Sequence, residues 1–559
     1  MTVKLDGKPT VALRPPSQVM RLARLGSLHQ CRLSFMRTLL RKLTQEGWTF
    51  SRPVFDIDAE GVGRAVYTAE GPSETYSLVC FGHDLPDDQR SDRVIAEAWD
   101  ATFTLTKGVP TAADIDRLEA NVPYQEVGRV TENEVSLSRA NRSVRLFGHV
   151  LECLAAGRQP DLEEINAVGY LMRTTAVYGS GKFGAADHPA GDAPFQKEML
   201  TVYLIRAFTL DLVEHMAALR APKTAVPLDP ALRRQFGVGN STGLGMAPFL
   251  IHHPVLLNNW IAAREEALAR VRSVAVATSA AQEVFRDVLA RSIRNVALWR
   301  SQHPVQVEKL ADLTRDLAAL AAEVKRGALT KADPWDGLVT WAEDHLSLEG
   351  QEQLVSLMLE PYPELVDDLT VGMGADEVAE FAINGSQSLA DFRAEVQAVY
   401  SWALELDWDD PTQVARCWYV SEEKLEPRLG ELAEEPLEPY AQPLSPARDI
   451  ARMARDLDGW DGADRLAAFL MRHPEHRHVA RRVQVVARHP YAEICDNTIA
   501  AEMLPIDLLR CKLSFFGATH FDPRSDRWVR ITMFRNAPFP AELGTAAEDW
   551  AYPEAACTP

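Results

Sequence analysis

The sequence has no apolar run long enough to cross a membrane and no paired-cysteine motif. A transmembrane helix needs ~20 predominantly apolar residues, and no stretch of the chain approaches this length. The first twenty residues hold no apolar core of a signal peptide. The seven cysteines are far apart and never spaced as CxxC, so neither a zinc knuckle nor a dithiol redox motif is indicated. These absences predict a cytoplasmic protein whose cysteines are small buried apolar residues.

Basic charge is also scarce. The 559 residues include 79 acidic and 59 basic side chains, which gives a formal net charge of −20. Non-specific binding to DNA, RNA or anionic lipid needs clustered positive charge, so the composition argues against nucleic-acid and membrane partners. With 46% hydrophobic and 25% charged residues, the chain has the balance of a folded protein.

The acidity is concentrated between Lys331 and Tyr440, where 26 residues are acidic and 5 are basic. Five tryptophans in this acidic segment exclude a disordered tail and predict a folded, mainly helical region. Two interpretations stay open. The segment is either a solvated helical surface or a docking face for a basic partner or a second copy of the chain, which would make a homo-oligomer. The four prolines of residues 434–446 predict a linker after it.

Hydrophobic periodicity predicts an α+β fold, mainly α with a small antiparallel β-sheet built from N- and C-terminal strands around a large multi-helix core. Leucine spacing over residues 17–46 predicts one basic amphipathic helix, and short β-rich runs lie between about Thr49 and Gly108. A capping box of Thr131 and Glu134 predicts a helix that runs to Gly157. Further helices are expected over 193–220 and after residue 445, and strands return at CKLSFFGATHF (511–521) and RWVRITMF (527–534).

These elements divide the chain into four expected regions. Residues 1–125 form an N-terminal helix with antiparallel strands, and residues 126–330 form a helical core with the candidate site. Residues 331–440 are the acidic segment. Residues 441–559 contribute C-terminal helices and the returning strands.

Several strings resemble functional motifs but lack the required context. GSGKFG (179–184) is followed by a loop instead of a helix, and GNSTG (239–243) is preceded by a helix-like segment instead of a strand. His473, His476 and His478 lie in RHPEHRH. The surrounding arginines, Arg472, Arg477, Arg481 and Arg482, oppose a divalent ion, so a solvated basic face is expected. The sequence therefore predicts no metal and no cofactor.

A charge-free stretch is the first candidate site. Residues 235–263 contain no Asp, Glu, Lys or Arg in 29 positions, yet they carry neutral polar side chains and four glycines. Such groups need hydrogen bonds or a ligand when buried, and glycines let backbone amides approach an anion. The residues expected to bind substrate here are Gly239, Asn240, Ser241, Thr242 and Gly243, with His252 behind them as a proton-transfer candidate.

The preceding helix and loop supply the rest of the expected site. From Met199 to Leu212 the expected helix is apolar nearly all round, and Arg206 is the only charge of this stretch before Asp211, so its guanidinium needs a carboxylate, a phosphate or several carbonyls. The glycine-containing loop 173–192 offers Arg173 as a second anion-binding residue. Its proton-transfer candidates are Tyr178, Lys182 and His188.

Together these residues predict a cytoplasmic enzyme that acts on a small anionic metabolite, a carboxylate or phosphate ester, by acid/base chemistry. Arg173 and Arg206 would hold the anion, and amides around Gly239 would stabilise negative charge. Two alternatives are kept. The first is a non-catalytic interaction protein that docks through the acidic segment, and the second is a metal-dependent enzyme using His252 or His253 with distant carboxylates.

Overall fold

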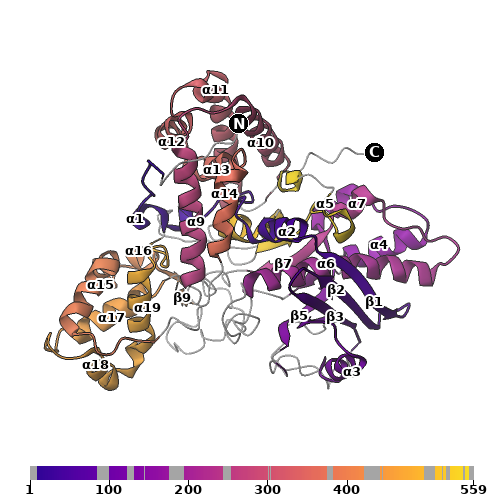
Figure 1. Ribbon diagram of the computed structural model, residues 1–559, viewed down its shortest axis with the longest axis horizontal. Coiled ribbons are helices and arrows are strands. Elements are labelled where there is room, and N and C mark those ends of the chain that lie inside the picture. The colour runs from indigo at the N-terminus through magenta and orange to yellow at the C-terminus, as the bar shows by residue number, and fades with distance from the viewer. Residues whose placement is uncertain are drawn as a thin grey trace.

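The structure is a computed structural model that describes most of the chain. It describes residues 9–84, 100–122, 131, 133–143, 145–174, 194–242, 254–299, 301, 304–373, 382–420, 441–443, 445–496, 510–518, 520–523, 529–544 and 548–552. Helices predominate (Figure 1), and no helix within these ranges is both long and apolar enough to span a membrane.

In the described part of the chain, nine strands form one mixed sheet in the order β1-β2-β3-β4-β5-β6-β7-β11-β10. All neighbours pair antiparallel except β6 and β7, which run parallel. The strand bounds are β1 (Thr49–Ile57), β2 (Gly63–Glu70), β3 (Thr75–Gly82), β4 (Ala101–Lys107), β5 (Glu134–Arg142), β6 (Tyr170–Thr174), β7 (Gly237–Thr242), β10 (His520–Pro523) and β11 (Val529–Met533).

The predicted α+β class is confirmed, but the predicted small antiparallel sheet is wrong in size and direction. Strands from both ends of the chain do enter one sheet, as expected, yet β5, β6 and β7 from the middle of the chain join them. The Thr131 hydroxyl donates to Glu134 Oε1 at 3.3 Å, which is a contact between the two side chains, and the residues that follow form β5 instead of the predicted helix. Alternating Val135 and Leu137 fit a strand, and the helix α4 (Leu146–Ala155) begins only after it.

The long helix α6 (Pro194–Arg220) lies between β6 and β7 in sequence and packs across the sheet. Residues from Met199 to Leu212 are buried almost without interruption, as an all-apolar helix surface predicts. The Phe208 ring meets Phe103 of β4 and Tyr67 of β2 edge-on, with centroids 5.4 and 6.3 Å apart. The short helix α3 (Ala112–Ala120) covers the opposite face, where Val66, Val79 and Phe81 pack against Ile115 and Leu118.

A body of helices lies beside the sheet (Figure 1). It comprises α9 (Pro254–Arg272), α10 (Ser279–Leu298), α11 (Pro304–Lys325), α12 (Pro334–His345), α13 (Leu348–Met358) and α14 (Pro363–Val366). These helices, the sheet and α6 share one large hydrophobic core. Smaller elements at its margin are α5 (Leu162–Val168), α7 (Pro230–Arg234) and the 3₁₀ turns η5 (Ala328–Thr330), η6 (Asp367–Met373), η11 (Pro540–Glu542) and η12 (Glu548–Ala551).

Two predicted elements near the chain ends differ from the structure. The single helix expected over 17–46 is divided into α1 (Pro16–Val19), η1 (Leu22–Arg24) and α2 (Phe35–Gln45). Gly26 interrupts it with φ +123°, where a Cβ atom would come within 2.6 Å of the Arg510 carbonyl oxygen. The first part of the strand expected over 511–521 is the π-helical η10 (Lys512–Phe516), which packs against α2.

The described part of the acidic segment is mainly helical, and some of its acids bind basic residues from the start of the same chain. Arg14 Nη1 and Arg24 Nη1 donate to Glu352 Oε1 of α13 at 2.9 and 3.0 Å. Arg37 Nη1 donates to Glu360 Oε1, just after α13, at 2.6 Å. A basic N-terminal segment and the acidic segment therefore form one buried contact.

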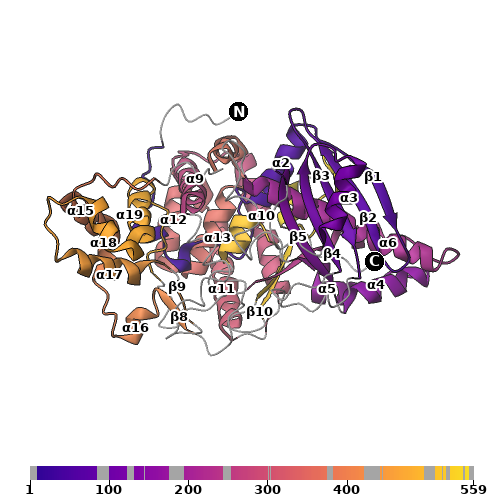
Figure 2. The ribbon, with the colours of Figure 1, turned by 90° about the horizontal axis from the view of Figure 1, so that it is seen from below.

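A second hydrophobic core is built from residues between about 383 and 492, at the lower left of Figure 1 and at one end of the view in Figure 2. Its helices are α15 (Leu389–Leu404), α17 (Ala447–Leu457), α18 (Leu466–Arg472) and α19 (Arg477–Arg488), with the 3₁₀ turn η9 (Pro474–His476) between the last two. The short helix α16 (Pro411–Val414) and the antiparallel pair of β8 (Trp418–Val420) and β9 (Ala441–Pro443) lie beside it.

Candidate functional site

The parallel pair β6 and β7 brings together two strand ends that precede the expected loops in the sequence. Because the strands run in the same direction, Thr174 at the end of β6 lies beside Asn240 near the end of β7. Asn240 Nδ2 donates to the Thr174 carbonyl oxygen at 3.1 Å, which ties the two ends together. The carboxyl ends of parallel strands joined by a helix are a common position for ligand sites. Segments 175–193 and 243–253 continue from this edge.

The structure brings some of the expected site residues together at this edge. Arg173 lies opposite Gly239 in the β6–β7 register, and Asn240, Ser241 and Thr242 follow along β7. Other expected residues lie outside the described part of the chain: Tyr178, Lys182, His188, Gly243 and His252.

Packing against a neighbouring ring explains why residue 239 is a glycine, and the sequence did not reveal this contact. The ring of Tyr170 lies against it, so a Cβ atom at Gly239 would come within 2.5 Å of the ring. Gly239 also has strand neighbours on both sides, β6 and β11, so its amide lies within the sheet and does not face a ligand. Ser241 and Thr242 pair with Arg530 and Val529 of β11, and the described part of β6 ends opposite Asn240.

Arg206 lies at the other end of β7 and is held by carbonyl groups. Its Nε donates to Phe236 O at 2.7 Å, its Nη1 to Ala537 O at 2.8 Å and its Nη2 to Arg234 O at 3.2 Å. Its guanidinium also lies 3.9 Å from the centre of the Phe539 ring. Burial lowers the pKa of Arg206 to about 9. Several carbonyls thus bind this buried cation, and the structure does not bring it to the carboxyl ends of β6 and β7.

Arg139 is a second arginine near Arg173 that the sequence did not predict as a site residue. Arg139 of β5 lies on the same face of the sheet as Arg173, because Asn141 pairs with Arg173 and side chains alternate along a strand. The Thr174 hydroxyl donates to the Arg139 carbonyl oxygen at 3.0 Å. The alternating side chains of residues 134–142 are typical of a strand and would have placed Arg139 on this face. The capping-box pattern favoured a helix there instead. Two basic residues therefore share one face at this edge.

A cavity of about 410 Å³ lies elsewhere, between β1, α6 and residues 225–227. Asp211 in its wall accepts hydrogen bonds from Arg52 (2.8 Å), Tyr67 (2.8 Å) and Arg233 (2.7 Å). His215 Nε2 lies 2.8 Å from the Ile57 carbonyl oxygen. The charged groups of this cavity are thus bound to one another, and they favour a structural role.

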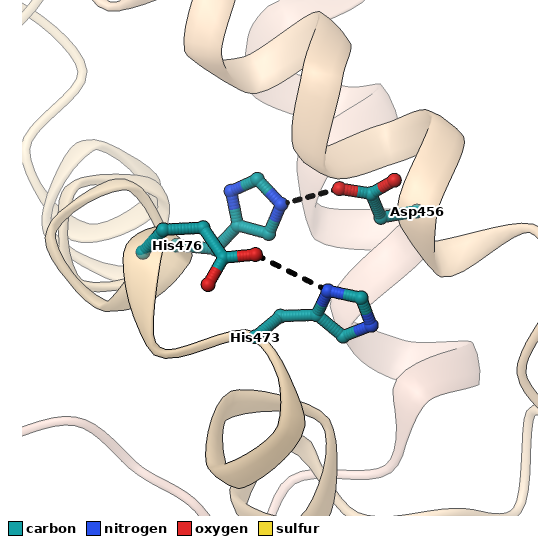
Figure 3. Close-up of side chains that lie close together, drawn as sticks. Asp456, His473 and His476 are labelled. Atoms are coloured by element: carbon teal, nitrogen blue, oxygen red, sulfur yellow. Dashed lines mark hydrogen bonds and ion pairs between the residues drawn. The ribbon is translucent and has the colours of Figure 1, made fainter.

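Four side chains in the second core form a group with the donor atoms of a metal site (Figure 3). His476 Nε2 lies 2.7 Å from Asp456 Oδ2, and His473 Nδ1 lies 3.3 Å from Glu475 Oε1. One donor atom from each residue lies within 4.8 Å of the others. The solvated basic face expected here is wrong for His476, which is buried. The sequence concealed the fourth member, Asp456, because it belongs to another helix.

No family model matches the chain, and no curated protein or solved structure is significantly similar to it. The function is therefore inferred from the residues and their geometry.

Proposed function

We propose that the protein binds a small anionic molecule, a carboxylate or a phosphate ester, at the carboxyl ends of β6 and β7 and acts on it as an enzyme. The observation that carries the proposal is the parallel pairing of these strands around α6, which places Arg173 beside Gly239 and Thr174 beside Asn240 at their carboxyl ends. An arginine fork matches the oxygens of a carboxylate or phosphate. Arg139 adds a second positive charge on the same sheet face.

The residues expected to move protons belong to the segments that continue from these strand ends. Tyr178, Lys182 and His188 follow β6, and His252 follows β7. We assign them acid/base roles on an anion held by Arg173, because a proton-transfer group must reach the reacting atom within hydrogen-bonding distance or through one water. Arg206 is left out of the anion site, since backbone carbonyls already occupy its guanidinium.

Isothermal titration of the full chain with inorganic phosphate, acetate and phenyl phosphate tests this proposal. Arg173→Ala should weaken binding of the preferred anion about 10-fold or more, because hydrogen bonds to charged groups contribute about 1.5–3 kcal/mol. Arg145→Ala is the matched control, since Arg145 is 59% exposed and pairs with Glu164 at 3.4 Å. The proposal fails if none of the three anions binds, or if Arg173→Ala binds them as tightly as the wild type.

The alternative of docking through the acidic segment would use acids that remain at the surface, such as Glu343 and Asp344. Arginines of the same chain already bind Glu352 and Glu360, which favours the anion proposal over this one. The metal-dependent alternative built on His252 or His253 concerns residues outside the described ranges.

A further inference from the structure

We propose that Asp456, His473, Glu475 and His476 form a binding site for one divalent metal ion of the zinc type. This site lies in the second core and is separate from the proposed anion site. Two imidazole nitrogens and two carboxylate oxygens are a ligand set that suits Zn²⁺.

Local structure fixes where these four residues lie. Asp456 is in the last turn of α17, and His473 directly follows α18. Pro474 then starts the 3₁₀ turn η9, which carries Glu475 and His476 and leads straight into α19. A bound ion would therefore connect α17 to the turn between α18 and α19.

The distances between donor atoms fit a metal site that is almost assembled. Zinc bonds of about 2.0–2.1 Å in a tetrahedron place neighbouring ligand atoms roughly 3.3 Å apart. His473 Nδ1 and Glu475 Oε1 are 3.3 Å apart, and His476 Nε2 and Asp456 Oδ2 are 2.7 Å apart. The four donor atoms lie within 4.8 Å of one another. Binding then requires the two pairs to approach each other and the hydrogen bond between His476 and Asp456 to open, so that these two donor atoms also lie roughly 3.3 Å apart.

Aromatic packing holds the two imidazoles in place. The Phe469 ring stacks on His473 at 4.9 Å and on His476 at 5.8 Å between centroids. Trp460 packs edge-on against Phe469 at 5.6 Å and against His473 at 6.2 Å. Side chains that are fixed before binding lose little rotamer freedom on binding, which favours affinity.

The local charge also accommodates a cation. Arg482, one of the four arginines expected to repel a metal, points inward, and its Nε donates to Glu493 Oε2 at 2.9 Å. Asp456 and Glu475 together supply two negative charges for a divalent ion. Both are accessible from solvent, with side chains 45% and 59% exposed, so an ion can reach them.

Titration of the chelator-treated full chain with Zn²⁺ alone tests the site, with Co²⁺ as a spectroscopic probe. We expect one Zn²⁺ per chain by calorimetry and intense visible absorption from cobalt with nitrogen and oxygen ligands. His476→Ala and Glu475→Gln should each weaken binding by at least the ~10–100-fold that loss of a second-shell partner costs. Glu475→Gln keeps the shape of an exposed side chain, so its binding remains measurable if His476→Ala fails to fold.

His478→Ala is the matched control. His478 is 64% exposed and lies 3.6 Å from Asp449, outside the group of four. Its removal should leave the affinity and the cobalt spectrum unchanged. If neither ion binds below ~1 mM, or if Glu475→Gln binds as the wild type does, the four residues are two histidine–carboxylate pairs and the proposal is wrong. Equal loss of binding in His478→Ala would likewise overturn it, because the site would then lie elsewhere.

Discussion

The Glu352 ion pairs of the large core and the Asp456 group of the second core differ in how much of their charge is already paired. In the large core, Glu352 is fully buried and binds Arg14, Arg24 and Arg264. Its negative charge is therefore paired with positive charges inside the protein. In the second core, Asp456 and Glu475 lie at the surface beside two histidines. Buried charges that are fully paired hold distant segments in place, whereas partly exposed donor groups keep their capacity to bind a ligand.

Among the replacements considered, that of Glu352 should have the largest effect on the free energy of unfolding. Burial by itself would raise the pKa of Glu352, but Arg14, Arg264 and Arg24 outweigh it and lower the pKa to about 2. Glu352→Ala leaves three arginines without their shared partner, and we expect a loss of about 3–5 kcal/mol in unfolding free energy. Urea unfolding followed by tryptophan fluorescence measures it.

Glu343→Ala, at an exposed position, is the control and should change stability by less than about 0.5 kcal/mol. A similar loss in both variants would show that the buried ion pairs of Glu352 stabilise the fold no more than an exposed carboxylate does.

The buried His29 predicts a pH dependence that belongs to the large core. Burial lowers the pKa of His29 to about 4, from its usual 6.5. Below pH 6.5 the unfolded chain takes up this proton while the folded protein does not, so the stability present above pH 6.5 is lost as the pH falls toward 4. The loss is on the order of 3 kcal/mol. His29→Leu should remove this part of the pH dependence, as measured by unfolding free energies at pH 7 and pH 4.5; an unchanged profile would contradict it.

A smaller effect is expected for a buried hydrogen bond of the second core. The Tyr400 hydroxyl donates to Glu493 Oε2 at 2.8 Å, and both side chains are buried. Tyr400→Phe should lower stability by about 1.5–3 kcal/mol, because hydrogen bonds to charged groups contribute this much. Tyr76→Phe is the comparison in the sheet, where the hydroxyl donates to the less buried Glu74 at 2.7 Å. Thermal unfolding should show a smaller loss of stability for Tyr76→Phe than for Tyr400→Phe. A larger loss for Tyr76→Phe would show that burial of the carboxylate is not the cause.

The smallest effect is expected at the surface of the second core. His478 and Asp449 are 3.6 Å apart and partly or largely exposed. His478→Ala should change the melting temperature little, because exposed pairs contribute about 0–1 kcal/mol. A loss above about 1 kcal/mol would show that surface charges of the second core stabilise it as buried charges stabilise the large one.

Several features of the fold followed from the sequence alone. The apolar surface of residues 199–212 indicated a buried central helix, and α6 is that helix. The β-rich runs between Thr49 and Gly108 form β1 to β4. Each of these depends on local periodicity, which a single segment carries within itself. The four-region division, the enzymatic role and the proton-transfer residues stay predictions.

Other features depend on contacts between residues that are distant in the chain. The capping-box pattern at Thr131 was compatible with a helix, but pairing with β4 and β6 makes residues 134–142 a strand. Arg206 needed a partner on any interpretation, and the tertiary structure supplies carbonyls from residues up to 331 positions away. Asp456 meets His476 only because α17 packs beside the α18–α19 turn. Periodicity encodes which elements form, but burial and charge pairing are decided by which distant segment arrives as a neighbour.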